Sequence, residues 1–171
     1  MLADPSALAF CQPVERAVGV EEPKKVDKAQ CIKQVQDICA PDLARMYAEF
    51  VSSKVSFSKE LAVEWCASDD EYTKCTGFHT LCNIAKDKKL SDTMFFLPYI
   101  IQIEQECQAE RNWVKEVMHW SLFAIGSVNK ELHTEAVAAA KKIGKVEVDY
   151  GKTSCETVDV LKHLLKSKYN S

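Results

Sequence analysis

Cysteine and histidine are the first residues of this sequence whose types and spacing could support chemistry. Cys75, His79 and Cys82 follow one another at i, i+4 and i+7, which places them on one face of any helix through them. Zinc accepts sulfur and imidazole ligands, but structural zinc sites usually draw them from turns or knuckles rather than from one rigid face. A Cys–His nucleophile built from Cys75 and His79 lacks an evident oxyanion donor. The pattern favours a buried core stripe, so the sequence predicts no metal site and no cofactor.

Carboxylate pairs and phosphate-binding loops give no stronger candidate. The pairs Glu21–Glu22 and Asp69–Asp70 are adjacent in sequence, so their side chains diverge on a helix and suit general acid–base catalysis poorly. Neither a P-loop nor a G-x-G-x-x-G motif occurs.

Composition describes a globular protein of one or two domains. The 171 residues are 47% hydrophobic and 27% charged, and 22 Lys and Arg against 25 Asp and Glu leave a net charge of −3. This balance argues against wrapping of nucleic acid by the whole surface, whereas residues 130–171, with eight Lys and six acidic residues, allow a local basic face. The longest nearly apolar run, Met94–Ile103, contains Pro98 and is too short to span a membrane.

The N-terminal segment and the eight cysteines bear on location. The first ten residues have no basic segment typical of a secretory signal, and no two cysteines form a C-x-x-C pair. We therefore expect an intracellular protein without a disulfide framework and without membrane contact. Nuclear and cytoplasmic residence stay undecided.

The elements that position these residues are helices. Apolar residues recur with helical spacing through most of the chain after residue 26, whereas Pro5, Pro13 and Pro23 interrupt the residues before it. We expect helix caps at Ser68 (with Glu71 in a capping box), Ser91, Asn129 and Thr157. The expected helices cover 26–39, 42–54, 58–66, 69–86, 92–106, 111–125, 130–143 and 158–168, with an irregular stretch at 145–155. Pro98 requires that the helix through it is kinked or begins late.

The spacing of these helices predicts an all-α fold of HEAT- or armadillo-like antiparallel helix pairs, an α-α superhelix. Expected helix starts near 69 and 111, and near 92 and 130, are about 40 residues apart, which is the period of such repeats. An unrelated helical bundle is the alternative that spacing leaves open. We expect an irregular leader over residues 1–26 and a HEAT-like repeat domain over 27–171.

Three segments resemble the HEAT-like DNA alkylation repair proteins, which are relatives of the AlkD-type alkylpurine DNA glycosylases. The segments are EWCASDDEYTKCTGF (64–78), FFLPYIIQIEQE (95–106) and AIGSVNKELHTEAVAAAKKIGKVEVDYGKTSC (124–155), of which the last is the most specific. The resemblance covers roughly residues 41–165. It implies a relative shortened at its N-terminus that binds duplex DNA on a concave basic surface, with alkylated duplex as a candidate ligand.

The resemblance also assigns candidate site residues, with mixed agreement. A Trp-Asp-x-x-Asp segment of the family falls on 41–45, so the first Asp matches Asp42, while Arg45 replaces the catalytic carboxylate. A shifted register would bring Asp37 near that role. An Arg in the place of a carboxylate would repel the cation that develops on the sugar.

The remaining DNA-binding candidates are aromatic and basic. Trp120 falls on the sugar-contacting Trp of the family, although an amphipathic helix would also place such a residue in the core. Tyr72 stands at the aromatic position of another family motif, next to Lys74. Lys115 and His119 are expected to face the same groove as Trp120.

Two functions follow from these observations. The first is a DNA-binding relative of alkylation-repair glycosylases that is weakly active or non-catalytic, so that enzymatic activity stays undecided. The second is a HEAT-like scaffold that binds a protein partner, or a second copy of the chain through the end of its shortened solenoid, without binding DNA.

Overall fold

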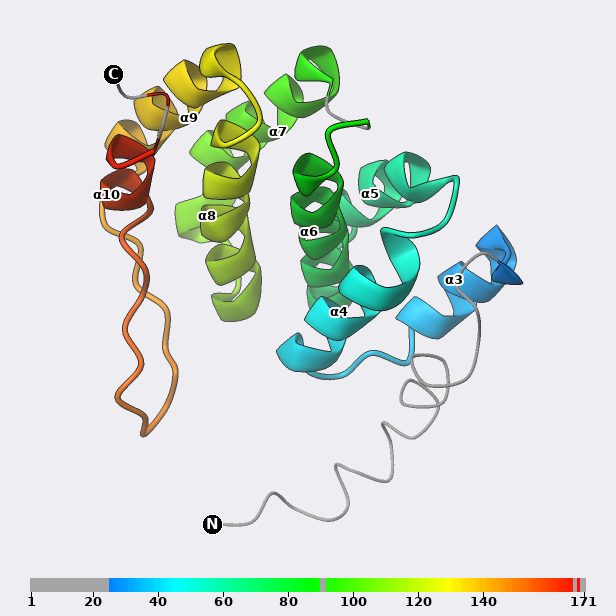
Figure 1. Cartoon of the computed structure of the whole chain (residues 1–171). Coiled ribbons are helices and arrows are strands. Elements are labelled where there is room, and N and C mark those ends of the chain that lie inside the picture. The colour runs from blue at the N-terminus through cyan, green and yellow to red at the C-terminus, as the bar shows by residue number, and fades with distance from the viewer. Residues whose placement is uncertain (1–24, 90–91, 168, 170–171) are drawn as a thin grey trace. The chain divides into compact units, whose positions relative to one another are not determined.

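The computed structural model describes residues 25–89, 92–167 and 169, and within these ranges the chain forms helices and loops but no strand (Figure 1). The predicted leader lies outside the described residues up to position 24. The chain divides into two compact units, of which unit 1 ends at Asn83 and unit 2 begins at Ile84.

The described part of unit 1, from residue 25 on, contains five helical segments. They are α3 (Lys28–Val35), α4 (Pro41–Tyr47), the π-helical turn η2 (Ala48–Ser52), α5 (Ser58–Cys66) and most of α6 (Glu71–Lys86). Pro41 opens α4, because a proline at the first position needs no backbone donor there. Side chains from all five of these segments, among them Tyr47, Leu61, Trp65 and Phe78, fill the core.

Close backbone packing joins α5 and α6 at Gly77. A Cβ atom at this position would lie 2.6 Å from the Cys66 nitrogen and 2.7 Å from the Trp65 carbonyl carbon. Only a residue without a side chain permits this approach.

Unit 2 consists of two layers of alternate helices. Its elements are α7 (Thr93–Glu106), the 3-10 turn η3 (Cys107–Ala109), α8 (Asn112–Gly126), α9 (Lys130–Ile143) and α10 (Val160–Leu165). Helix α7 packs on α9, and α8 packs on α10, so each layer contains every second helix (Figure 1). This arrangement of antiparallel pairs is the one that helical periodicity predicted.

Several helix boundaries agree with the sequence. The side-chain oxygen of Asn129 accepts from the Leu132 amide and caps α9, as expected. That helix ends at Gly144, whose φ of 69° is readily adopted by glycine and costly for other residues.

Other predicted boundaries are wrong. Asp70, not Ser68, caps α6, because its carboxylate accepts from the Thr73 amide while Ser68 Oγ accepts from Asp70 N. Asp159, not Thr157, caps α10, because its carboxylate accepts from the Lys162 amide. In both cases a carboxylate two residues later gives the helix N-terminus a charged acceptor.

Helix α7 corrects one further expectation. It begins at Thr93 and contains Pro98, so the late start is wrong. Asp92 accepts from the Met94 amide, and the predicted cap Ser91 lies outside the described residues.

Candidate nucleic-acid interface

One side of α8 carries a row of partly exposed aromatic residues. Trp113, Glu116, Trp120 and Phe123 follow at i, i+3, i+7 and i+10, and none of them is fully buried. Trp120 is the most open of the three aromatic side chains, with 38% of its surface exposed. The helix therefore presents a face that is apolar but not covered.

Helix α10 adds a third ring to this face. The ring centroids of Trp120 and Phe123 are 5.2 Å apart, and that of His163 lies 6.3 Å from Trp120 and 5.8 Å from Phe123. We call Trp120, Phe123 and His163 the ring cluster. The tilted contact with Phe123 and the edge-to-face contact with His163 hold the indole in place, while part of that ring still faces solvent.

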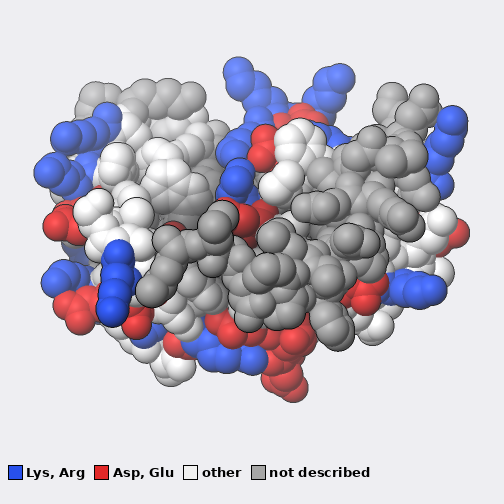
Figure 2. Space-filling view, turned by 90° about the horizontal axis from the view of Figure 1, so that it is seen from below, with Lys and Arg blue, Asp and Glu red and all other residues white. Residues whose placement is uncertain are grey.

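Basic residues border the ring cluster. Lys162 and Lys166 are exposed on α10, one residue before and three residues after His163. Figure 2 shows blue atoms next to red ones on the visible described surface, without one continuous field of a single sign. The described surface in this view is therefore mixed in charge.

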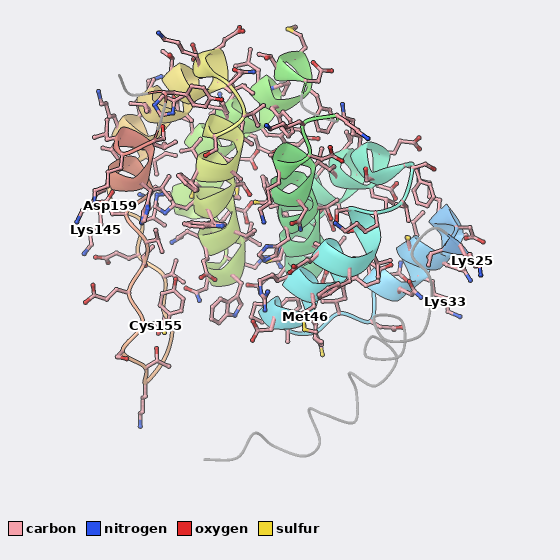
Figure 3. The ribbon with its side chains drawn as sticks, in the orientation of Figure 1. Lys25, Lys33, Met46, Lys145, Cys155 and Asp159 are labelled. Atoms are coloured by element: carbon pink, nitrogen blue, oxygen red, sulfur yellow. The ribbon has the colours of Figure 1, made fainter. Side chains whose placement is uncertain are left out.

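A long connection joins α9 to α10 and is hydrogen-bonded to α8. We call residues 144–159 the α9–α10 loop; it leaves α9, extends away from the helices and returns to α10 (Figure 1). It contains most of the segment IGKVEVDYGKTSC, which is the most specific part of the family resemblance. Figure 3 places Lys145 and Asp159 where the loop meets the helices and Cys155 further along it.

Amide side chains fix the first limb of this loop. Asn112 binds the backbone of Asp149 twice, since its Nδ2 donates to the Asp149 carbonyl at 2.8 Å and its Oδ1 accepts from the Asp149 amide at 2.7 Å. Gln108 Nε2 donates to the carbonyls of Ile143 and Lys145, each at 2.9 Å. The two limbs are joined where Thr157 Oγ1 accepts from the Val148 amide at 3.0 Å.

Tyr150 fastens the loop to the aromatic row of α8. Its hydroxyl donates to Glu116 Oε1 at 2.9 Å, and its ring lies 6.1 Å from that of Trp113. Burial, followed by the hydrogen bond to the Glu116 carboxylate, raises the pKa of Tyr150 to about 12. The hydroxyl therefore stays protonated and available as a donor at neutral pH.

A cavity of about 370 Å³ lies between the loop, α8, the end of α9 and the start of α10. His119 of α8 lines it, and only 6% of this residue is exposed. Burial lowers the pKa of His119, and the Asp159 carboxylate opposes part of that shift. The imidazole is therefore neutral at pH 7. The other lining residues are Ala140, Lys141, Gly144, Lys145, Val146, Thr157, Val158, Asp159 and Leu161.

The candidate residues of unit 1 lie on several elements. Asp42 and Arg45 are brought together on α4, where Arg45 Nη2 lies 3.8 Å from Asp42 Oδ1. Asp37 is exposed just after α3. Tyr72 and Lys74 are half-buried on α6, and burial is the main cause that raises the pKa of Tyr72.

The candidates on α8 diverge. Trp120 belongs to the ring cluster, whereas His119 lines the cavity. The expectation of one shared groove is therefore wrong for these two residues. Lys115 is half-buried one turn before His119. Phe123 and His163 were not predicted as neighbours of Trp120. The spacing of Trp113, Trp120 and Phe123 on one helix face is a usable signal for Phe123, whereas no sequence pattern indicates His163.

The cysteine–histidine stripe lies on α6, with Cys75 and Cys82 buried and His79 half-buried. In the described part of the chain, no group of three or more His, Cys, Asp or Glu residues could hold a metal ion. No helix in that same part is long and apolar enough to cross a membrane.

Comparisons with known proteins identify two relatives by sequence. An uncharacterized protein of Listeria innocua and one of Listeria monocytogenes are each 26% identical to this chain over 107 residues. The match covers 63% of this chain and 46% of each relative, so it spans about half of the length of those proteins. No family model matches the chain.

A solved structure shares the fold. It is described as a new family of proteins related to the HEAT-like repeat DNA glycosylases, with affinity for branched DNA structures. The TM-score is 0.77 at 18% sequence identity, and the match covers 86% of this chain and 63% of that one. The predicted all-α, HEAT-like fold is thereby confirmed.

Proposed function

We propose that this protein is a DNA-binding relative of the HEAT-like repeat DNA glycosylases and that it binds branched DNA through the ring cluster. The observation that carries the proposal is the partly exposed Trp120, held by Phe123 and His163 beside the lysines of α10. The fold likeness to a family with affinity for branched DNA supports it.

The ring cluster suits bases that have lost a stacking partner. At a branch point the helical stack is interrupted, so base faces are open to an aromatic side chain. Stacking of one base on such a side chain contributes about 1–3 kcal/mol and tolerates any sequence. Trp120 is open enough to stack, and its neighbours reduce the entropy lost when it is fixed.

Lysines near the rings would bind the phosphates. Lys162 and Lys166 are exposed on α10, and each phosphate contact releases counterions and makes binding depend on salt. Lys115 and Lys74, half-buried on α8 and α6, are further candidates from the family resemblance, together with Tyr72. We expect their contribution to be smaller because their ammonium groups and ring are less accessible.

We propose that excision of alkylated bases is weak or lost. Arg45 stands where the family resemblance expects the catalytic carboxylate, and it lies 3.8 Å from Asp42 and 3.7 Å from Glu49. An arginine among these carboxylates reduces the negative charge that could stabilise a sugar cation. Asp37, exposed after α3, is the remaining carboxylate that the shifted register suggested.

Fluorescence anisotropy tests the proposal. The full chain is titrated against labelled four-way junction, fork and duplex DNA between about 50 and 200 mM salt. We expect tighter binding of the branched molecules, and Trp120→Ala should weaken it about five- to 100-fold, which corresponds to one lost stacking contact. Phe50→Ala is the matched control, because Phe50 is a comparably exposed aromatic residue on η2.

Two results would contradict the proposal. One is the absence of salt-dependent binding to any of the three DNA molecules. The other is an equal loss of affinity in Trp120→Ala and Phe50→Ala. An assay for base release from alkylated duplex, run on the same protein, tests the catalytic part separately.

A protein-binding scaffold is the second candidate, and one observation favours it. Helix α7 exposes 76% of Met94 and 51% of Ile101, with the exposed Pro98 between them on the same face. Exposed apolar side chains in a row are typical of protein interfaces. Under this alternative, Met94→Lys and Ile101→Lys would abolish association with a partner or a second copy. Neither the native protein nor these variants would bind DNA.

A further inference from the structure

The cavity beneath the α9–α10 loop contains a polar side chain that the protein itself leaves unused. His119 is 94% buried, and it makes no hydrogen bond to any described residue although it lines an open space. Among the described residues, only His133 Nε2 is a buried side-chain nitrogen without a partner, so the ring nitrogens of His119 are open to the cavity and to a ligand in it. As a neutral imidazole, His119 offers one donor and one acceptor to such a ligand.

The walls of the cavity are mainly aliphatic. Ala140, Val146, Val158 and Leu161 line it from α9, the loop and α10. Walls of this kind favour a flat apolar body over a strongly hydrated one. The volume of about 370 Å³ falls in the range typical of small-molecule sites.

Charged and hydroxyl groups complete the lining. Lys141 and Lys145 supply ammonium groups at the end of α9, and Thr157 and Asp159 supply a hydroxyl and a carboxylate from the other limb. Lys145 Nζ forms an ion pair with Glu147 Oε1 at 2.8 Å, whereas Lys141 has no partner among the described residues. Lys141 is therefore the ammonium group of the lining that is left for an anionic ligand, opposite the Asp159 carboxylate.

We propose that this cavity binds a nucleotide with a 5′-phosphate, either a free nucleoside monophosphate or the terminal nucleotide of a DNA strand. The planar base would lie between the aliphatic walls. His119, Thr157 and Asp159 together offer donors and acceptors for its polar edge, and Lys141 offers a charge for the phosphate. This proposal does not depend on the proposed binding of branched DNA, because the ring cluster is not part of the cavity lining.

Nuclear magnetic resonance of the histidine rings tests the proposal. The chain has four histidines, so the His119 signal is assigned by its loss in His119→Gln. Titration of the full chain with AMP, GMP, CMP and TMP should shift that signal saturably for at least one of them. A short DNA strand with a 5′-phosphate, compared with its 5′-hydroxyl form, shows whether a strand end is bound as well.

Two neighbouring lysines provide a matched pair of variants. Lys141 lines the cavity, whereas Lys142 binds Glu104 Oε1 at 2.8 Å and does not line it. Both side chains are exposed, so neither substitution should disturb folding. We expect Lys141→Gln to weaken nucleotide binding about tenfold, through loss of a charge-assisted contact, and Lys142→Gln to leave it unchanged.

Three results would overturn the proposal. They are no shift of the His119 signal with any nucleotide or strand, equal weakening by Lys141→Gln and Lys142→Gln, and binding of inorganic phosphate as tight as that of every nucleotide. Failure of the junction-binding assay leaves this proposal standing, and failure here leaves the DNA proposal standing.

Discussion

Asn112 is one of the side chains that hold the α9–α10 loop, and removing its amide is a sharp test of the structure. Asn112 exchanges two hydrogen bonds with the Asp149 backbone, at 2.8 and 2.7 Å, much as a neighbouring strand would. Asn112→Ala deletes both bonds. The start of α8 should not suffer, because the N-cap residue is Arg111 and makes no side-chain cap. We therefore expect the loop to loosen while the helix persists.

The free energy that the loop loses in Asn112→Ala follows from the exposure of the loop. Asp149 is exposed, so water replaces the lost partner, and each bond contributes near the lower end of the usual 0.5–1.5 kcal/mol. Two bonds then amount to about 1–2 kcal/mol, which raises the population of the open loop about five- to 30-fold.

Hydrogen exchange of individual amides measures this effect. The Asp149 amide, which donates to Asn112, and the Gly151 amide, which donates to Asp149 Oδ1 at 2.7 Å, should exchange faster by that factor. Amides in the middle of α9 should not change. Asn83→Ala is the control, because the Asn83 side chain donates to the His79 carbonyl within α6. Unchanged exchange at Asp149 in Asn112→Ala would refute this account of how the loop is held.

Two further predictions concern packing and protonation. Gly77→Ala should destabilise unit 1 by about 1–3 kcal/mol, since the new Cβ would lie 2.6 Å from the Cys66 nitrogen and the gain in helix propensity is smaller; a calorimetric melt with an unchanged or raised transition would contradict it. The pKa of His119 is lowered in the folded state, so the unfolded chain binds a proton at this residue at higher pH than the folded chain does. The contribution of His119 to stability is therefore lost as pH falls from about 6.5 toward the depressed folded-state pKa. Urea unfolding should therefore show a smaller advantage of the native protein over His119→Gln at pH 5 than at pH 7, and an equal difference at the two pH values would show that the prediction is wrong.

Local sequence signals predicted the helices well because each helix is specified by residues a few positions apart. The Asn129 cap, the end of α9 at Gly144 and the amphipathic pattern of α8 needed no information from distant parts of the chain. The errors at Ser68 and Thr157 have the same local character. In each case an aspartate close by was a better acceptor for the orphan amides of the helix start.

The site was less predictable because its contacts join residues that are far apart in sequence. The bonds from Asn112 to Asp149 and from Tyr150 to Glu116 cross more than 30 residues, and no periodicity indicates them. The pairing of Trp120 with His163 is of the same kind. The sequence could therefore nominate Trp120 but could not identify what surrounds it.

The different surroundings of His119 and Trp120 on α8 follow from helix geometry. Successive residues of a helix are about 100° apart, so His119 and Trp120 necessarily face different surroundings although they are neighbours in sequence. His119 lines the cavity, to which the α9–α10 loop contributes lining residues. Trp120 belongs to the ring cluster. The expectation that His119 shares a groove with Trp120 because it is the neighbouring residue therefore merges two surfaces that the helix separates. Because no residue belongs to both the ring cluster and the cavity lining, a substitution on one surface changes no residue of the other, and the two proposals can be tested separately.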